Sequence, residues 1–122
     1  MKKRILVVDD EPDILSIVEA RLIALGYEVL TARDGQEGLN TARKESPDMI
    51  LLDLMLPKLD GYKVCRMLKF DKTYDHIPIV IFSAKGSVAD KKMAEEVGAD
   101  AYLTKPFNQE TFKQTIQKLI GS

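Results

Sequence analysis

The chain has 122 residues, enough for one domain with a single hydrophobic core. Its composition, 45% hydrophobic and 30% charged, is typical of a soluble globular protein, and no apolar run approaches the roughly 20 residues of a membrane-spanning helix. A net charge of −1 gives no electrostatic reason to expect direct binding to nucleic acid or to a membrane, and one Cys cannot form an internal disulfide. We therefore expect a single cytoplasmic domain over residues 1–122.

Short apolar runs alternate with amphipathic stretches along the whole chain. In chain order the predicted elements are strand 5–8, helix 12–25, strand 27–32, helix 35–46, strand 49–52, helix 61–70, strand 79–82, helix 88–97, strand 101–104 and helix 109–120. The first run, Ile5–Val8, follows a basic N-terminus but stops at two acids, so it is too short for the hydrophobic region of a signal peptide. It predicts a strand that is covered on both faces.

Several helix starts carry residues that suit them. Pro12 is tolerated in a first helical turn, and Asp34 and Glu37 have the spacing of a capping box. Ser87 and Asn108 are candidate N-caps for the last two helices. Five strands alternating with five helices predict an α/β fold, in which helices cover both faces of a parallel sheet and form three layers.

Chemically active side chains follow four of the predicted strands. The first strand ends in Asp9 and Asp10, the third in Asp53, the fourth in Ser83 and the fifth in Lys105. In a parallel sheet these ends lie at one edge, which is where open α/β sheets bind ligands. The sequence therefore predicts one small site that holds three carboxylates, a hydroxyl and an ammonium group.

These residue types suit phosphoryl chemistry. Mg²⁺ prefers oxygen ligands and takes one or two carboxylates, which Asp10, with Asp9 behind it, and Asp53 can supply. An Asp carboxylate can also act as the nucleophile that forms an aspartyl phosphate. Lys105 would balance the charge on the transferred group, and Ser83 would donate a hydrogen bond to one of its oxygens.

The strand-end residues belong to a longer ordered set of motifs. The motifs are Asp9-Asp10 after Val7-Val8, Asp53 within Leu51-Leu52-Asp53-Leu54-Met55-Leu56-Pro57, Asp60-Gly61, Ser83-Ala84, Gly98-Ala99-Asp100 and Lys105-Pro106-Phe107. With this set the sequence resembles the receiver domains of two-component response regulators, over essentially the whole chain. The resemblance implies one receiver domain over 1–122 with a doubly wound sheet of strand order 2-1-3-4-5.

The resemblance also implies a role for each site residue. Asp53 would be the phosphoacceptor, and a Mg²⁺ or Mn²⁺ ion would be held by Asp9, Asp10, Asp53 and the backbone carbonyl of Met55. Ser83 would sense the phosphoryl group and Lys105 would bridge to it. Tyr102 would be the aromatic residue whose rotamer changes on activation. The peptide bond between Lys105 and Pro106 would be cis.

A receiver domain of this kind would take its phosphoryl group from the phosphohistidine of a sensor histidine kinase or a histidine phosphotransfer protein. It would catalyse its own Mg²⁺-dependent phosphorylation and dephosphorylation, so it would be a regulatory domain rather than a conventional enzyme. The change would reach the face formed by the helix after Ser87, the strand at Tyr102 and the last helix. That face would bind a downstream protein or an output domain outside this chain.

Each residue also has a simpler interpretation. Asp9 and Asp10 alone would be read as a solvated strand end with a helix cap, Ser83 as a loop hydroxyl and Lys105 as a solvated charge. Tyr102 alone is as readily a packing residue as a switch. Because Asp53 and Lys105 are predicted at the same edge, the site is the better interpretation of the set.

Three other functions fit the sequence less well. A phosphatase of the haloacid dehalogenase type needs an acid two residues after its nucleophile, where Met55 stands here. A flavin carrier needs a hydroxyl- and glycine-rich loop after the first strand, but Asp9–Pro12 is acidic and would repel phosphate unless a cation intervened. A receiver-like scaffold that is never phosphorylated usually lacks the acceptor, a metal acid or the lysine, and this chain has all of them.

The output is less defined than the site. DNA-binding regulators that dimerise through their last helices often carry a second acid after Gly-Ala-Asp and arginines in the final helix, whereas Ala101 follows Asp100 here and the last helix has no Arg. This difference favours a stand-alone switch over that dimer. A domain excised from a longer regulator is the alternative.

Overall fold

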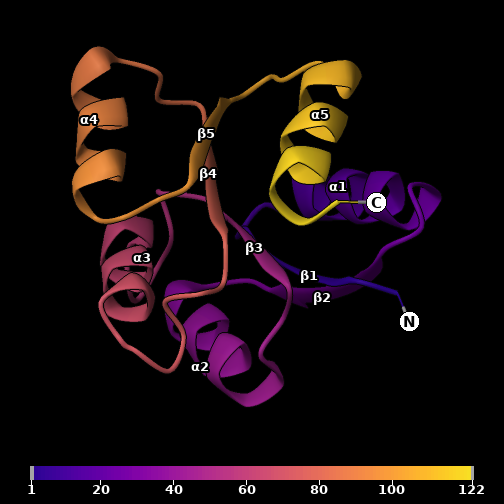
Figure 1. Ribbon diagram of the computed structural model, residues 1–122. Coiled ribbons are helices and arrows are strands. Elements are labelled where there is room, and N and C mark those ends of the chain that lie inside the picture. The colour runs from indigo at the N-terminus through magenta and orange to yellow at the C-terminus, as the bar shows by residue number, and fades with distance from the viewer. Residues whose placement is uncertain (1, 122) are drawn as a thin grey trace.

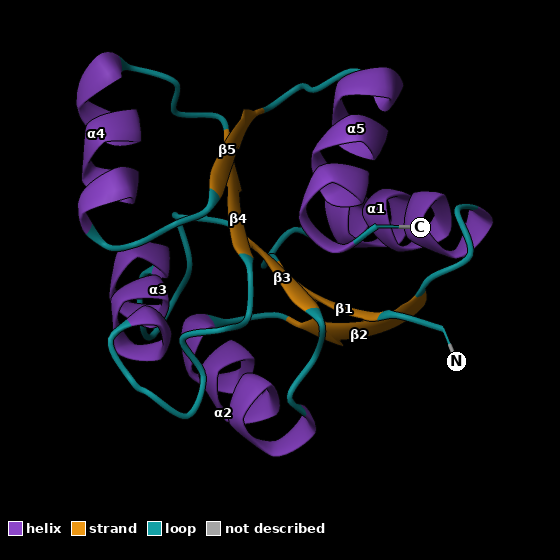
Figure 2. Ribbon diagram, viewed as in Figure 1, coloured by secondary structure: helices purple, strands orange, loops and turns teal. Residues whose placement is uncertain are grey.

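A computed structural model describes residues 2–121. Strands and helices alternate from one end to the other (Figures 1 and 2). The strands are β1 (Arg4–Val8), β2 (Glu28–Ala32), β3 (Met49–Leu52), β4 (Ile79–Ser83) and β5 (Ala101–Thr104). The helices are α1 (Pro12–Ala24), α2 (Gly35–Glu45), α3 (Gly61–Lys69), α4 (Val88–Glu96) and α5 (Gln109–Ile120).

The five strands form one parallel sheet in the order β2-β1-β3-β4-β5. Helices α1 and α5 lie on one face of this sheet, and α2, α3 and α4 lie on the other (Figure 1). The predicted three-layer α/β fold, with its strand order, is confirmed. In a parallel sheet the carboxyl ends of all strands share one edge, so this topology places the residues that follow the strands together.

Two hydrophobic cores explain why β1 is apolar throughout. Ile5 and Val7 pack in the core under α1 and α5, and Leu6 and Val8 pack in the core under α2 and α3. All four side chains are fully buried. Successive residues of a strand point to opposite faces, so a strand covered on both sides needs an apolar residue at every position.

The caps follow the sequence pattern, with one difference. Asp34 accepts a hydrogen bond from the N–H of Glu37 at 2.8 Å, as predicted for a capping box. The Glu37 carboxylate accepts from the N–H of Arg33 at 2.7 Å, one residue before the cap, instead of from the cap itself. Ser87 and Asn108 cap α4 and α5 through their side chains, as predicted.

Three strand limits differ from the prediction by one residue, the first because β1 begins at Arg4 instead of Ile5. Tyr27 was expected in the second strand but precedes β2, and its hydroxyl donates to the carbonyl of Gly121 at 2.7 Å. Ser83 closes β4 because its backbone pairs with Thr104 of β5.

Among the helices that the structure describes, none combines the length and apolar character needed to cross a membrane.

Candidate functional site

The carboxyl edge of the sheet gathers the four strand-end side chains that the sequence singled out. Asp9 follows β1, Asp53 follows β3, Ser83 ends β4 and Lys105 follows β5. Asp9 and Ser83 are fully buried and Asp53 is 4% exposed, and these three are the buried polar or charged residues within 2–121. Because burying a charge is costly without a partner, two buried carboxylates at one edge indicate a built site.

Lys105 holds the two buried carboxylates together. Its Nζ lies 2.8 Å from Oδ2 of Asp9 and 3.3 Å from Oδ2 of Asp53. The ammonium group also lies 4.6 Å from the centre of the Phe82 ring, within reach of a cation–π interaction. Lys105 is therefore a structural partner of both acids, so the interpretation as a solvated charge does not apply.

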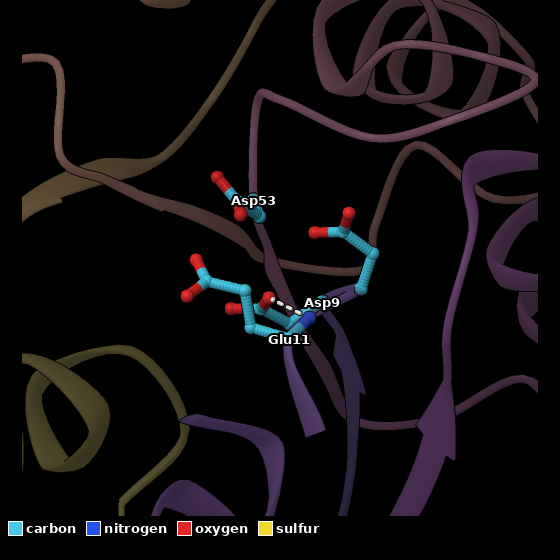
Figure 3. A group of neighbouring side chains, drawn as sticks. Asp9, Glu11 and Asp53 are labelled. Atoms are coloured by element: carbon cyan, nitrogen blue, oxygen red, sulfur yellow. Dashed lines mark hydrogen bonds between the residues drawn. The ribbon is translucent and has the colours of Figure 1, made fainter. Parts of the chain in front are cut away.

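Two further carboxylates complete an acidic cluster. Asp9, Asp10, Glu11 and Asp53 each offer an oxygen, and these oxygens lie within 4.8 Å of one another. Figure 3 shows the labelled side chains of Asp9, Glu11 and Asp53 around one small space. The N–H of Glu11 donates to Oδ1 of Asp9 at 2.9 Å, the dashed line in that figure. Asp10 and Glu11 are exposed, so the cluster opens to solvent.

Glu11 was not among the predicted site residues. From the sequence, Glu11 was expected only as part of an acidic loop, because it follows the strand end by three positions and directly precedes the helix. The hydrogen bond from its backbone to Asp9 turns the chain so that its carboxylate joins the cluster. The run of three acids before Pro12 was the available signal.

The donor set fits a hard divalent cation. Every group in the cluster is a carboxylate oxygen, the ligand type that Mg²⁺ and Mn²⁺ prefer. One half-buried ammonium group faces two buried acids and two exposed ones, so negative charge is in excess. A cation bound there would relieve the repulsion among the carboxylates.

The acceptor candidate has partners on both oxygens. Oδ2 of Asp53 faces Lys105, and Oδ1 accepts a hydrogen bond from the N–H of Met55 at 3.3 Å. Burial raises the pKa of the Asp53 carboxyl above its ordinary value; the charge of Lys105 opposes this rise and the charge of Asp9 adds to it. Ionising Asp53 at this site therefore costs free energy. Such a cost is typical of a carboxylate that reacts or binds a cation.

Lys105 shows the opposite balance. Burial lowers its pKa, but the hydrogen bond to Asp9 and the charges of Asp53 and Asp9 outweigh burial, so the pKa lies above its ordinary value. The group therefore keeps its positive charge at neutral pH. Its peptide bond to Pro106 is cis.

Ser83 and Tyr102 meet at the loop between β4 and α4. The N–H of Lys85 donates to Oγ of Ser83 at 3.2 Å, and the hydroxyl of Tyr102 donates to the carbonyl of Lys85. Tyr102 is half-buried, and its ring packs beside Ile81. The backbone of Lys85 thus connects the two residues that the family resemblance identifies as the switch pair.

An open hollow lies beside the acidic cluster. Its volume is about 510 Å³. The lining residues are Asp10, Leu54, Met55, Leu56, Pro57, Asp60, Tyr62 and Lys85. The Met55 side chain is 60% exposed there, which places an apolar group within two residues of Asp53.

Comparison with known families decides the identity of the fold. The model of the response regulator receiver domain matches residues 5–117. The chain belongs to this family. A probable transcriptional regulator of Cyanophora paradoxa, ycf27, is 47% identical over 119 residues, which cover 98% of this chain and 48% of the relative. The chain spans about half the length of the curated relatives it matches.

Solved receiver structures agree with the fold. A response regulator of Chloroflexus aurantiacus superposes with a TM-score of 0.94 at 30% identity, with both chains covered completely. The receiver domain of the sensor histidine kinase PA1611 of Pseudomonas aeruginosa gives 0.91 at 33% identity, again with complete coverage of both chains. That second structure contains a magnesium ion coordinated in its active-site cleft.

Proposed function

We propose that this receiver domain is a phosphoacceptor switch that takes a phosphoryl group onto Asp53. The observation that carries the proposal is the arrangement around that side chain. A buried carboxylate has Lys105 on one oxygen and the N–H of Met55 on the other, at the edge of a cluster of four acids. Such an arrangement positions a nucleophilic carboxylate and places positive charge where a phosphoryl group would arrive.

The transfer itself is an in-line displacement. An oxygen of Asp53 forms a bond to phosphorus while the bond from phosphorus to the donor breaks, and the donor leaves with the bonding electrons. Lys105, already within 3.3 Å of the acceptor, offsets charge on the incoming oxygens. Asp9, Asp10 and Asp53, with the carbonyl of Met55, are the proposed holders of Mg²⁺ or Mn²⁺. Such an ion supplies further positive charge when bound.

Phosphorylation would act on the rest of the molecule through the loop at Lys85. The modification adds about −1.5 to −2 charge units and new acceptor oxygens beside Ser83. If Ser83 turns toward the phosphoryl group, the hydrogen bond that Lys85 now makes to it is lost, and the neighbouring contact with Tyr102 is free to rearrange. We place the resulting change on the face formed by α4, β5 and α5, as a shift between two packings.

The donor in this proposal is the phosphohistidine of a sensor histidine kinase or of a phosphotransfer protein, and the exchange takes place in the cytoplasm. The downstream partner is a protein target or an output domain outside this chain. Relatives that are named transcriptional regulators are about twice as long as this chain, which favours an output domain over a stand-alone switch.

The direct test uses a small phosphodonor. The purified protein is incubated with acetyl phosphate, with and without Mg²⁺, and its intact mass is recorded. We expect the mass of one added phosphoryl group, dependent on Mg²⁺, in the wild type and in the Asp75→Asn control, and none in Asp53→Asn. Equal labelling of Asp53→Asn and the wild type would contradict Asp53 as the acceptor.

A further inference from the structure

Tyr62, the second residue of α3, reaches from the acceptor loop to α4. Its hydroxyl donates to the carbonyl oxygen of Asp90 at 3.2 Å and lies 3.4 Å from Oδ1 of the same residue. Its ring packs against a small buried cluster of Leu54, Ile81 and Ala94. Tyr62 therefore packs against the residue that follows Asp53, against β4 and against α4.

The start of α3 is in direct contact with the backbone of the acceptor. The N–H of Gly61 donates to the carbonyl of Leu54 at 3.0 Å. A Cβ atom on Gly61 would lie 2.2 Å from the carbonyl oxygen of Asp53 and 2.8 Å from Cα of Leu54. Because there is no room for even one extra carbon atom, a displacement of the acceptor backbone must move the first turn of α3 as well.

The other end of the contact is the cap of α4. The N–H of Asp90 donates to Oγ of Ser87 at 3.1 Å, and the Ser87 hydroxyl donates to Oδ2 of Asp90 at 2.7 Å. Tyr62 adds a donor on the carbonyl and on the remaining carboxylate oxygen of Asp90. Burial raises the pKa of Tyr62 to about 12, so the phenol keeps its proton and remains a donor at neutral pH.

We propose that Tyr62 is a positioning residue that couples the backbone at Asp53 to the first turn of α4. The coupling rests on the proposed function, because it gives phosphorylation of Asp53 a second path to the α4–β5–α5 face. It is separate from the Tyr102 contact, in which the hydroxyl binds the carbonyl of Lys85 on the preceding loop. The two tyrosines hold that loop and the start of α4 from different elements, β5 and α3.

The direction of the effect follows from the geometry. The Tyr62 bond holds α4 in the unphosphorylated arrangement described here, so its loss shifts the population toward a displaced α4. If phosphorylation favours the displaced state, then by linkage a variant already shifted toward that state should also be phosphorylated faster. A residue with a purely structural role would weaken the fold without either effect.

The test compares Tyr62→Phe with Tyr74→Phe. Tyr74 is also half-buried and donates its hydroxyl to a backbone carbonyl, that of Arg43, which lies in α2 instead of α4. Each change removes one oxygen and keeps the ring. Amide hydrogen exchange is followed across the chain before and after treatment with acetyl phosphate and Mg²⁺, and the rate of phosphoryl gain is measured by intact mass.

In Tyr62→Phe we expect exchange in the first turn of α4 to rise by roughly fivefold before phosphorylation, the effect of one net hydrogen bond. The further change on phosphorylation should shrink, and the phosphoryl gain should be faster. Tyr74→Phe should leave α4 and the rate unchanged. Unaltered α4 exchange in Tyr62→Phe, or the same uniform loosening in both variants, would overturn the proposal.

A wild type that gains no phosphoryl group contradicts the proposed function and the coupling with it. Amide exchange in the unmodified proteins then still decides whether Tyr62 restrains α4.

Discussion

At the scale of single residues, the site is a compromise between burial and charge. Asp9 and Asp53 are buried next to one ammonium group, and two exposed acids offer oxygens within 4.8 Å of theirs. Such a cluster is costly for the fold, because like charges in a poorly solvated place repel one another. The cost is expected where a site is built to bind cations or react with electrophiles rather than to stabilise the domain.

The raised pKa of Asp53 gives a prediction with a defined sign. A carboxyl whose folded-state pKa lies above its unfolded value contributes stability below the unfolded pKa, and that contribution is lost as pH rises through the folded pKa. Ionised Asp53 therefore costs stability at neutral pH when no cation is bound. We expect Asp53→Asn to stabilise the metal-free protein at pH 7 by about 1 kcal/mol, and the gain to vanish below about pH 4.

Thermal unfolding with a chelator present, at several pH values, measures this difference. The matched control is Asp75→Asn, which changes an exposed acid outside the cluster and should not alter the melting temperature. A less stable Asp53→Asn at pH 7 would mean that the ion pair with Lys105 outweighs burial.

Met55 supports a prediction about the lifetime of the phosphoryl group. Its exposed side chain and that of Lys85 line the hollow beside Asp53, where a hydrolytic water must approach. We expect Met55→Ala to speed dephosphorylation by roughly tenfold, equivalent to about 1.4 kcal/mol in the barrier. The control is Met67→Ala, which shortens an exposed methionine that lies on α3, away from this loop, and should leave the rate unchanged. Equal lifetimes in all three proteins, measured by the decay of the phosphorylated mass, would remove this role from Met55.

The sequence allowed the central residues of the site to be predicted, but not its periphery. Asp9, Asp53, Ser83 and Lys105 directly follow or end strands, and parallel strands bring their carboxyl ends together whatever the details of packing. The position of Glu11 depends on a turn held by a side chain. The contacts of Tyr62 depend on how two helices pack, for which a single sequence carries no periodic signal.

At the scale of elements, the start of α3 packs directly against the backbone of Asp53. Asp60 caps this helix by accepting from the N–H of Lys63 at 3.0 Å, and Gly61 then passes directly under the backbone of Asp53. The Asp60-Gly61 pair was noted in the sequence only as a family motif. The structure supplies its physical reason: a cap is needed, followed by a residue without a side chain.

The contact at Gly61 predicts a linked loss of stability and reactivity. Ala at this position would place its Cβ 2.2 Å from a backbone oxygen that cannot rotate away, so the acceptor loop must shift. We expect Gly61→Ala to destabilise the protein by about 2–3 kcal/mol and to reduce its phosphorylation by acetyl phosphate.

The comparison for this test is Gly26→Ala. Gly26 has a positive φ of 96° and open space around its Cβ position, so Ala there costs about 1–2 kcal/mol through backbone strain alone. Its rate of phosphorylation should match that of the wild type. A normal phosphorylation rate in Gly61→Ala would show that the acceptor tolerates movement of α3.

At the scale of the whole molecule, the net charge is close to zero although one edge of the sheet carries concentrated negative charge. The order of the elements could be predicted from alternating apolar and amphipathic segments, which are typical of a parallel sheet covered by helices on both faces. The strand order 2-1-3-4-5 came only from the family resemblance, because alternation alone fits several doubly wound arrangements.

The charge concentrated at this edge predicts that Mg²⁺ stabilises the entire domain. A ligand that binds only the folded state adds stability in proportion to the logarithm of its concentration, about 1.4 kcal/mol when the concentration is ten times Kd. We expect millimolar Mg²⁺ to raise the melting temperature of the wild type and to have a smaller effect on Asp10→Asn. Matched ionic strength with KCl separates binding from screening. A melting temperature that does not respond to Mg²⁺ would argue against a metal at this edge.

Chemical identification of the modified residue distinguishes Asp53 from every other acid as the phosphoacceptor. Protein treated with acetyl phosphate and Mg²⁺ is reduced with borohydride, which converts an aspartyl phosphate to homoserine, and is then digested and mapped by mass spectrometry. We expect homoserine at position 53 and at no other acid, with none when Mg²⁺ is omitted. Homoserine at Asp9, Asp10 or elsewhere, with position 53 unmodified, would contradict this expectation.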